Sequence, residues 1–309
     1  MAVTRLLLTS LTLFVALLVL AFEFSDYARP PRTRFSSLKG NMSCHGVIRS
    51  PEEWRPPLTP DWLQDLAQDV PELVRHVCDE WVLPPSTGER RLLQPEREHY
   101  SQRGQSEFVD ELLNHKTNGF FVESGAFDGE ELSNSLFFEK SRNWTGLLVE
   151  PNPSSFLSLL EKRRRAYMVN ACLSPKTKSL VTPFTMSELI GGLSDYMEQT
   201  HKVRIEQESN EAVPIVNVQC FPLYSILKAI GVTHIDYFSL DVEGAELEIL
   251  FTLPLDQITV DVFSIEYVVT NNQQASDRKL EIIKKYLVDS HGYRIVQIGE
   301  GEDVILKKF

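Results

Sequence analysis

The pattern of hydrophobic and polar positions divides the chain into three parts. Residues 6–22 form one uncharged, largely apolar run, and residues 25–100 are interrupted repeatedly by proline. From residue 101 onward, short apolar runs alternate with segments of helical periodicity. Such alternation is typical of parallel βαβ units, whose strands are buried on both faces of the sheet. The pattern therefore predicts an N-terminal segment over 1–24, a proline-rich stem over 25–100 and an α/β domain over 101–309.

Within the α/β domain, each short apolar run is interpreted as a strand and each periodic segment as a helix. The last two strands are separated only by a turn rich in Gly and Glu, which predicts an antiparallel hairpin on a mostly parallel sheet. The polar segment 194–213 is either a lid over a substrate or partner, or an ordinary solvated loop. The predicted strands cover 120–124, 146–150, 166–173, 235–241, 260–267, 293–298 and 303–307, and the predicted helices cover 62–70, 153–164, 221–230, 245–251 and 277–290.

The apolar run 6–22 is long enough to cross a bilayer as a helix, which takes about 17–25 residues, whereas the core of a signal peptide takes about 7–15. We therefore predict a membrane anchor, with a cleaved signal peptide as the alternative. Basic residues after the run favour a cytosolic domain. The glycosylation sequons at Asn41 and Asn143, and a possible Cys44–Cys78 disulfide, favour a lumenal one. We expect the lumenal orientation.

Composition narrows the classes of partner. The chain carries 31 Lys and Arg against 43 Asp and Glu, a net charge of −12, so it lacks the basic surplus that recruits phosphates, and we expect no nucleic-acid partner. The single basic run, 162–165, ends a predicted helix, where cations offset the helix dipole. No pair of His has zinc-ligand spacing, and we assign no metal-binding residues. Cys172 and Cys220 either form a disulfide or are buried free thiols, the interpretation we prefer.

Acidic residues and glycines follow the first two predicted strands. Gly125 and Gly129 permit a tight turn and a close approach of a ligand, while Glu123 and Asp128 make that turn unsuitable for a pyrophosphate. Glu150 ends the second strand, where a carboxylate accepts the ribose hydroxyls of an adenosine cofactor. The alternative is that the glycines only form a structural turn and that Glu150 only caps the helix that follows it. Taken together, they favour a cationic adenosine cofactor, S-adenosyl-L-methionine, over NAD.

A further acidic cluster follows the strand predicted over 235–241. Asp241, Glu243 and Glu246 lie within six positions, and Glu266 ends the next strand. Such carboxylates could bind the ammonium of a cofactor, act as a general base toward a hydroxyl, or ligate a metal through oxygen. The alternative is that they stabilise a helix N-terminus against its dipole. We assign Asp241, Glu243 and Glu246 to catalysis.

Several motifs over roughly residues 118–309 resemble the FkbM-type methyltransferase family. They are VESGAFDG, GLLVEPNP, NACLS, GGLS and IDYFSLDVEGAELEIL. The resemblance implies a Rossmann-like class I methyltransferase fold that uses S-adenosyl-L-methionine. It implies that the cofactor lies against Glu123, Gly125, Asp128, Gly129, Glu150, Asn170 or Ala171, and Glu266, with Asp241 at its methionine end or at the methyl acceptor.

The apolar run, the stem and the form FSLDVEGAE are similar, within that family, to Star-like single-pass membrane proteins. This similarity implies a location in the endoplasmic reticulum, Golgi and endosomes, and a role in vesicle transport of secretory cargo for epidermal growth factor receptor signalling. Ser239 stands where bacterial family members commonly carry Lys, an amine near the transferred methyl group. Two functions therefore stay open: O-methyl transfer to a hydroxyl, such as that of a glycan, and non-catalytic trafficking.

Overall fold

The computed structural model of the chain describes residues 44, 54, 56, 57, 60–187, 189–209, 212–298 and 302–309. These residues belong to one compact unit, Met42–Phe309. The predicted anchor over 1–24, the sequon at Asn41 and most of the stem before residue 60 lie outside the described residues. Among the described residues, no helix combines the length and apolar character needed to span a bilayer.

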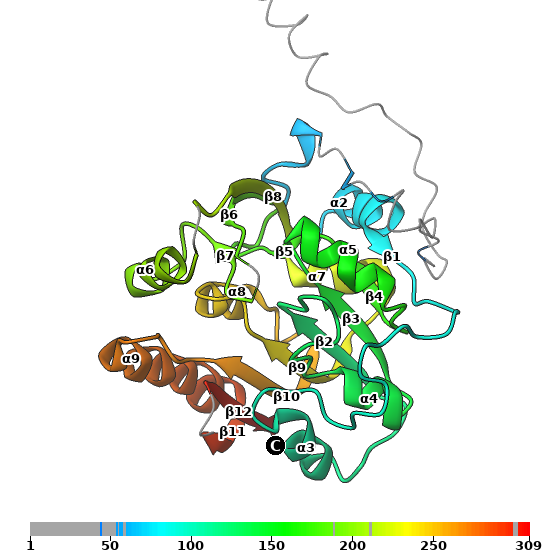
Figure 1. The fold of residues 1–309 in the computed structure, drawn as a ribbon, viewed down its shortest axis with the longest axis vertical. Helices are drawn as coiled ribbons and strands as arrows, with labels where there is room; N and C mark the ends of the chain where they lie inside the picture. Colours follow the sequence, from blue (N-terminus) through cyan, green and yellow to red (C-terminus); the bar gives the residue numbers. More distant parts are fainter. Residues whose placement is uncertain are drawn as a thin grey trace, which may run out of the picture. The chain divides into compact units, whose positions relative to one another are not determined.

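A large sheet forms the centre of the fold (Figure 1), with the strand order β1-β4-β3-β2-β9-β10-β12-β11. Its central strands β4, β3, β2, β9 and β10 are parallel, and β12 lies antiparallel between β10 and β11. This arrangement confirms the predicted α/β fold with an antiparallel C-terminal hairpin. The strands are β1 (Val82–Leu83), β2 (Phe120–Ser124), β3 (Thr145–Val149), β4 (Tyr167–Val169), β9 (His234–Leu240), β10 (Thr259–Glu266), β11 (Tyr293–Ile298) and β12 (Asp303–Lys308).

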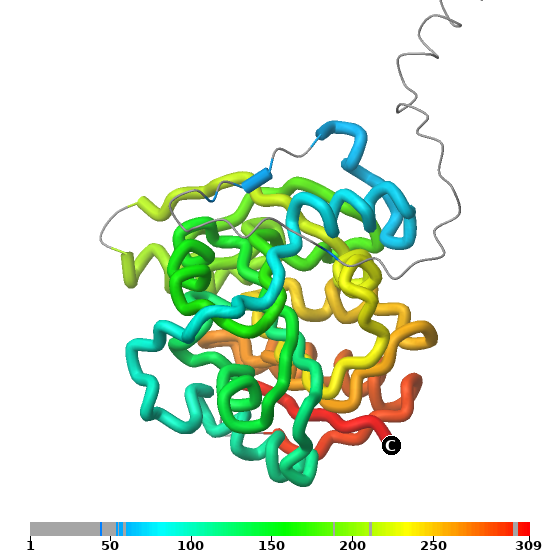
Figure 2. Tube along the Cα trace, turned by 90° about the vertical axis from the view of Figure 1, so that its right-hand side faces the viewer, coloured from blue at the N-terminus to red at the C-terminus, as the bar shows by residue number. Residues whose placement is uncertain are grey.

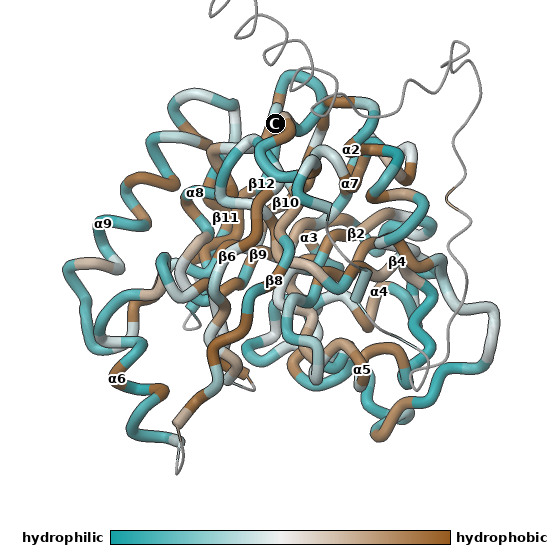
Figure 3. The backbone as a smooth tube through the Cα atoms, turned by 90° about the horizontal axis from the view of Figure 1, so that it is seen from above, coloured by the Kyte–Doolittle hydropathy of each residue, from teal (hydrophilic) through white to brown (hydrophobic). Residues whose placement is uncertain are grey.

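Both faces of the central strands are buried, which explains why these strands are largely apolar. Phe121 and Tyr237 pack into one hydrophobic core, whereas their chain neighbours Val122 and Phe238 pack into another. Successive side chains of a strand point to opposite faces, so the two cores lie on opposite sides of the sheet. In Figure 3 the hydrophobic stretches accordingly gather in the central strands.

Helices cover both faces (Figure 2). On one face α2, α7, α8 and α9 contribute to the core, and on the other α3, α4 and α5 do. In α7, Leu223, Ile226 and Leu227 recur at helical spacing and are buried, and Gly231 ends the helix at φ +72°. The helices are α2 (Pro71–His76), α3 (Gln105–Leu112), α4 (Leu136–Ser141), α5 (Pro153–Glu161), α7 (Leu223–Ile230), α8 (Glu246–Thr252) and α9 (Gln273–Lys284), which η3 (Lys285–Asp289) extends.

A second, four-stranded sheet was not predicted. It has the order β5-β8-β6-β7 and consists of β5 (Cys172–Leu173), β6 (Leu180–Thr185), β7 (Gly192–Leu193) and β8 (Ile215–Phe221). The strand predicted over 166–173 is divided at Asn170 and Ala171, so that β4 joins the central sheet and β5 the second one. Within the polar segment 194–213 the chain forms a helix, α6 (Gln199–Glu208).

The described part of the predicted stem packs on the domain. The helix predicted over 62–70 is wrong: a short turn, η1 (Asp61–Leu63), stands there, and Pro71 begins α2, because proline costs no hydrogen bond at a first helical position. The next turn, η2 (Val77–Trp81), places Trp81 against Phe221, with ring centroids 5.1 Å apart. Strand β1 then extends the central sheet by pairing with β4.

Two disulfides join distant parts of the fold. Cys44 is bonded to Cys78, which ties the start of the described chain to η2. Cys172 is bonded to Cys220, its partner in the β5–β8 pairing. The interpretation of Cys172 and Cys220 as free thiols was therefore wrong, because the register of two strands from separate parts of the sequence brings them together.

Candidate functional site

The pocket lies where the strand order of the central sheet reverses direction. From β2 the chain continues to β3 on one side, and from β9 it continues to β10 on the other. Ligands of open α/β sheets bind at such a point, beyond the carboxyl ends of the strands. The cavity there has a volume of about 70 Å³, smaller than the roughly 300–1,000 Å³ usual for ligand sites. It is lined by Ser124, Gly125, Phe127, Glu150, Pro151, Asn152, Cys172, Leu173, Phe184, Ser187, Leu189, Gly191, Leu193, Asp241, Val242, Glu243 and Ile249.

Gly125 allows the ends of three strands to meet at this pocket. Its backbone has φ +85°, and its N–H donates to the carbonyl of Val149, 3.1 Å away, at the end of β3. A Cβ atom at this position would collide with the carbonyl oxygen of Asp241, just beyond β9. Only glycine therefore fits both the backbone conformation and the contact.

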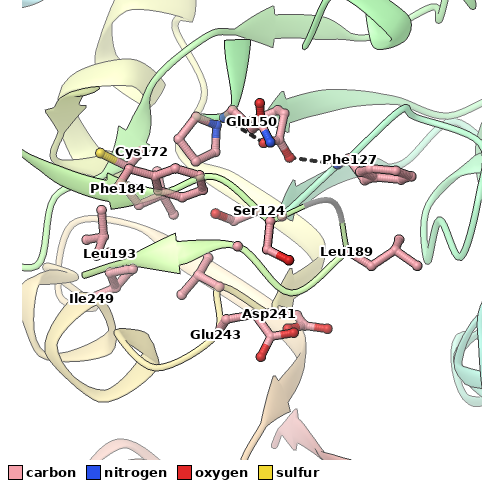
Figure 4. Close-up of a pocket in the computed structure, with 17 residues that line it drawn as sticks. Ser124, Phe127, Glu150, Cys172, Phe184, Leu189, Leu193, Asp241, Glu243 and Ile249 are labelled. Atoms are coloured by element: carbon pink, nitrogen blue, oxygen red, sulfur yellow. Dashed lines mark hydrogen bonds between the residues drawn. The ribbon is translucent and has the colours of Figure 1, made fainter. Parts of the chain in front are cut away.

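Glu150 lies on one side of the pocket (Figure 4) and is 5% exposed. Its Oε2 accepts the backbone N–H of Phe127 at 2.8 Å and its Oε1 that of Asn152 at 2.7 Å. Asn170 donates from Nδ2 to the backbone carbonyl of Glu150 at 2.9 Å and so holds the loop after β3 in place. Burial raises the pKa of Glu150 to about 8. Each carboxylate oxygen has a second lone pair with which to accept from a ligand.

Asp241 and Glu243 lie on the opposite side, with Ser124 between them and Glu150 (Figure 4). Burial and then repulsion by Glu243 raise the pKa of Asp241 well above its usual value. Burial and then repulsion by Glu246 raise the pKa of Glu243 to about 8. Glu243 has φ +60°, and its Oε2 lies 3.4 Å from Nδ1 of His201 in α6. The site therefore holds acids that are difficult to ionise unless a cation binds beside them.

Glu246, Glu266 and Lys279 lie behind Asp241 and do not line the pocket. Glu246 is fully buried and accepts N–H groups of the 242–244 loop. Lys279 donates to it at 2.7 Å, and although burial opposes ionisation, this ammonium holds the pKa of Glu246 below its usual value. Glu266 is 8% exposed, and burial, then repulsion by Asp241, raise its pKa well above normal.

Besides Asn170 and Glu266, three more of the residues predicted to bind cofactor lie outside the pocket lining. Glu123 accepts hydrogen bonds from the loop 133–135 with both oxygens. Asp128 caps the following turn and lies 3.0 Å from Nζ of Lys162. Gly129 has φ +77°, and a Cβ there would collide with a side chain of α5. These residues shape the turn after β2 and do not face a ligand.

The sequence reasoning missed the apolar wall of the pocket. Strands of the second sheet supply Cys172, Phe184 and Leu193 to this wall. A Cβ at Gly192 would approach the carbonyl oxygens of Val242 and Glu243 to 3.1 Å, so β7 contacts the acidic loop through backbone. The motif GGLS was the only sequence signal of this contact, and its role depends on a sheet that was not predicted.

Two groups of described residues place possible metal-ligand atoms within 4.8 Å of one another. The first is His234, Asp236 and Asp261, near the amino ends of β9 and β10, whereas the pocket lies at the carboxyl ends of the strands. There Asp236 pairs with Lys116 and accepts the backbone N–H of a β2 residue at 2.7 Å. The second group is Asp241, Glu246 and Glu266, adjacent to the pocket.

Comparison with known proteins finds similarities in structure and in sequence. Similar solved structures include a human methyltransferase 10 domain containing protein (13% identity, TM-score 0.35, 66% of this chain and 80% of that one). A putative rRNA-methylase from Clostridium thermocellum is also similar (7% identity, TM-score 0.34, 67% of this chain and 98% of that one). So is the O-methyltransferase NovP (9% identity, TM-score 0.32, 66% of this chain and 78% of that one). No curated protein matches significantly in sequence. The family model of the methyltransferase FkbM domain matches residues 123–295, more than half of the chain, and the chain therefore belongs to the FkbM methyltransferase domain family.

Proposed function

We propose that this domain binds S-adenosyl-L-methionine and transfers its methyl group to a hydroxyl oxygen. The observation that carries the proposal is the placement of Glu150 and of the pair Asp241 and Glu243 on opposite sides of one pocket in an FkbM domain. One side offers hydrogen-bond acceptors to ribose hydroxyls, and the other offers negative charge to a sulfonium and an ammonium.

The residues present fit this cofactor. Glu150 would accept the two ribose hydroxyls with lone pairs that its backbone donors leave free. The apolar wall of Leu173, Phe184 and Leu193 would cover the adenine ring. Asp241 would attract the cationic methionine end, because an opposite charge within a few ångströms favours ionisation of the carboxyl group. Neither Glu246 nor Glu123 is needed for contact with the cofactor.

The bound cofactor supplies an electrophilic methyl group on a sulfonium, and the protein has to orient and deprotonate the acceptor. Glu243 is the base we assign, because a pKa of about 8 is close to the working pH and suits proton abstraction. His201, 3.4 Å from Glu243, positions this carboxylate from α6. Asp241 would hold the acceptor oxygen in line with the methyl group.

Calorimetric titration of the full chain with S-adenosyl-L-methionine tests the proposal. The wild-type protein is expected to bind, and Glu150→Gln should weaken binding roughly 10- to 100-fold, since a hydrogen bond to a charged group contributes about 1.5–3 kcal/mol. Glu131→Gln makes the same chemical change at an exposed position and should bind like the wild type. Absence of binding to the wild-type protein would refute the proposal.

A non-catalytic trafficking factor of the Star-like type is the second candidate. Ser239 is buried, and its hydroxyl accepts from Asn134 at 2.9 Å instead of presenting an amine to the pocket. Among the described residues that line the pocket, none is Lys or Arg. Cofactor binding without methyl transfer to any hydroxylated acceptor, including glycans, would favour this candidate.

We further propose that the domain is lumenal and anchored to the membrane by the run 6–22, as a single-pass protein of the endoplasmic reticulum, Golgi and endosomes. Two disulfides support an oxidising compartment. Asn143 is exposed in the turn before β3, where a glycan can be attached. A lumenal position would give the site access to secretory cargo or to glycan acceptors.

A further inference from the structure

We propose that Trp54, a residue of the proline-rich stem, positions the carboxyl group of Glu150 for the ribose of the cofactor. The inference rests on the proposed function, which assigns the ribose hydroxyls to Glu150, and adds to it a residue from a distant part of the sequence. Trp54 does not line the pocket, so it acts through the residues it contacts and not on the cofactor itself.

Trp54 is packed into one of the two hydrophobic cores. It is 3% exposed and belongs to the core on the face of the central sheet that α5 covers. Its ring lies 5.2 Å from the ring of Phe156 in α5, centroid to centroid, with 46° between the two planes. Aromatic pairs at such distances stabilise each other beyond the area they bury. The indole ring is therefore fixed in orientation, and so is the direction of its N–H group.

One side-chain amide connects Trp54 to the loop that carries Glu150. Nε1 of Trp54 donates to Oδ1 of Asn170 at 3.4 Å, across 116 positions of the sequence. Nδ2 of Asn170 donates to the backbone carbonyls of Glu150 at 2.9 Å and Pro151 at 3.4 Å. If this amide turned over, its NH₂ group would face the indole N–H and its oxygen would face the carbonyls, so both sets of bonds would be lost. Trp54 thus holds the amide in the orientation that retains Glu150.

The place of the Glu150 carboxyl group depends on the backbone that Asn170 holds. Its two oxygens accept the backbone N–H groups of Phe127 at 2.8 Å and Asn152 at 2.7 Å, the first of which is drawn in Figure 4. Hydrogen bonds weaken steeply as their angles depart from linearity. A shift of about 1 Å in a residue that positions a substrate is enough to impair a site. Freeing the backbone of Glu150 should therefore weaken its contact with the ribose.

The stem is tied to the domain in a way that keeps Trp54 near this loop. Cys44 is bonded to Cys78, so Trp54 lies within a covalently closed part of the chain. Shortly after Cys78, strand β1 pairs with β4, the strand that precedes Asn170. Closing a loop reduces the conformational freedom of the residues inside it. A segment with the composition of a linker is thereby made part of the proposed cofactor site.

Calorimetric titration of the full chain with S-adenosyl-L-methionine, in two tryptophan variants, tests the inference. Trp54→Phe keeps an aromatic ring beside Phe156 and removes the N–H donor to Asn170. It should weaken binding about three- to fivefold, within the effect of losing one neutral hydrogen bond. Trp62→Phe makes the same change elsewhere in the stem, where the residue is 49% exposed, and should bind like the wild type.

A double-mutant cycle distinguishes positioning from a general loss of stability. In a protein that already carries Glu150→Gln, Trp54→Phe should change the affinity by less than about twofold, because the carboxylate that it positions is gone. Asn170→Ala removes the connecting amide and should depend on Glu150 in the same way, which keeps the test independent of how well Trp54→Phe folds. Unchanged affinity in both variants, equal losses with and without Glu150→Gln, or an equal loss in Trp62→Phe would each overturn the inference.

Amide hydrogen exchange separates this inference from the proposed function, because it needs no cofactor. The backbone N–H of Asn152 donates to Glu150 and should exchange faster in Trp54→Phe than in the wild type or in Trp62→Phe. A wild type that binds the cofactor, with exchange and affinity unchanged in Trp54→Phe, would overturn the positioning role and leave the proposed function intact. Faster exchange at Asn152, in a protein whose wild type does not bind the cofactor, would support the positioning of the loop and refute the proposed function.

Discussion

At the scale of single residues, the site depends on how each carboxyl group is partnered. Glu150 is buried with only backbone N–H donors, Glu243 is half-buried beside the repelling Glu246, and the pKa of each is about 8. Glu246 is buried more deeply than either, but Lys279 and backbone donors keep it ionised. Glutamates thus take different roles: Glu150 and Glu243 are available to a ligand, and Glu246 holds the 242–244 loop in place.

Affinity for S-adenosyl-L-methionine should depend on pH through Glu150. Ribose hydroxyls donate to the ionised carboxylate, so binding lowers the Glu150 pKa from about 8 and releases a proton. Affinity should therefore rise with pH up to about 8 and level off above it. Calorimetry at pH 7 in two buffers of different ionisation heat measures the released proton, and Glu150→Gln should remove this part of the release. Equal affinity at pH 6 and pH 8 would contradict the prediction.

At the scale of elements, close backbone contacts hold the pocket together. The end of β2 touches the chain beyond β9 at Gly125, and β7 touches the acidic loop at Gly192. In the same loop, a Cβ at Gly244 would lie 2.6 Å from the carbonyl oxygen of Tyr196. The pocket therefore depends on the absence of side chains at these three glycines.

Replacing Gly125 with Ala should lower the free energy of unfolding and weaken cofactor binding. Gly231 offers a matched control, because it also has a positive φ, but a Cβ added there would meet no atom within 4 Å. Gly231→Ala should cost about 1 kcal/mol for the backbone conformation alone. Gly125→Ala should cost clearly more, since it adds the collision with Asp241. Urea unfolding compares the two variants, and equal losses would argue against the collision.

The sequence predicted elements well where the pattern was local. The strand expected over 120–124 is β2 itself, because its residues are apolar and followed by turn glycines. The second sheet was missed because β5 and β7 have only two residues each. Strand β6 is partly polar, and its buried positions alternate with half-buried ones. The break between β4 and β5 was missed because 166–173 is apolar except for Asn170, and periodicity cannot reveal a change of sheet.

At the scale of the whole molecule, residues distant in sequence complete the fold. Arg164 is fully buried and donates to Glu139 at 2.7 Å, while Arg90 donates to the same carboxylate at 2.5 Å. The basic run 162–165 was interpreted as a helix end whose cations offset the dipole, because no local pattern reveals a buried ion pair. The carboxylates near the pocket were found because strand ends of one sheet share an edge, but their partners, such as Lys279, were not.

Orientation across the membrane is tested by glycosylation at Asn143. If the domain is lumenal, glycosidase treatment of the expressed full chain should increase its electrophoretic mobility. Thr145→Ala, which destroys the sequon, should reduce that shift by one glycan, whereas Thr145→Ser keeps the sequon and a hydroxyl that donates to the Arg165 carbonyl at 2.9 Å. A mobility unaffected by glycosidase would refute the lumenal orientation.

The glycine contact between β7 and the acidic loop also bears on how new acceptor preferences could be engineered. At Gly192 an added Cβ would lie 3.1 Å from two carbonyl oxygens of the acidic loop, so a side chain there would press on that loop. Leu189, in contrast, lines the pocket and is 46% exposed. Libraries that aim to change the acceptor should therefore vary Leu189 and keep Gly192 fixed.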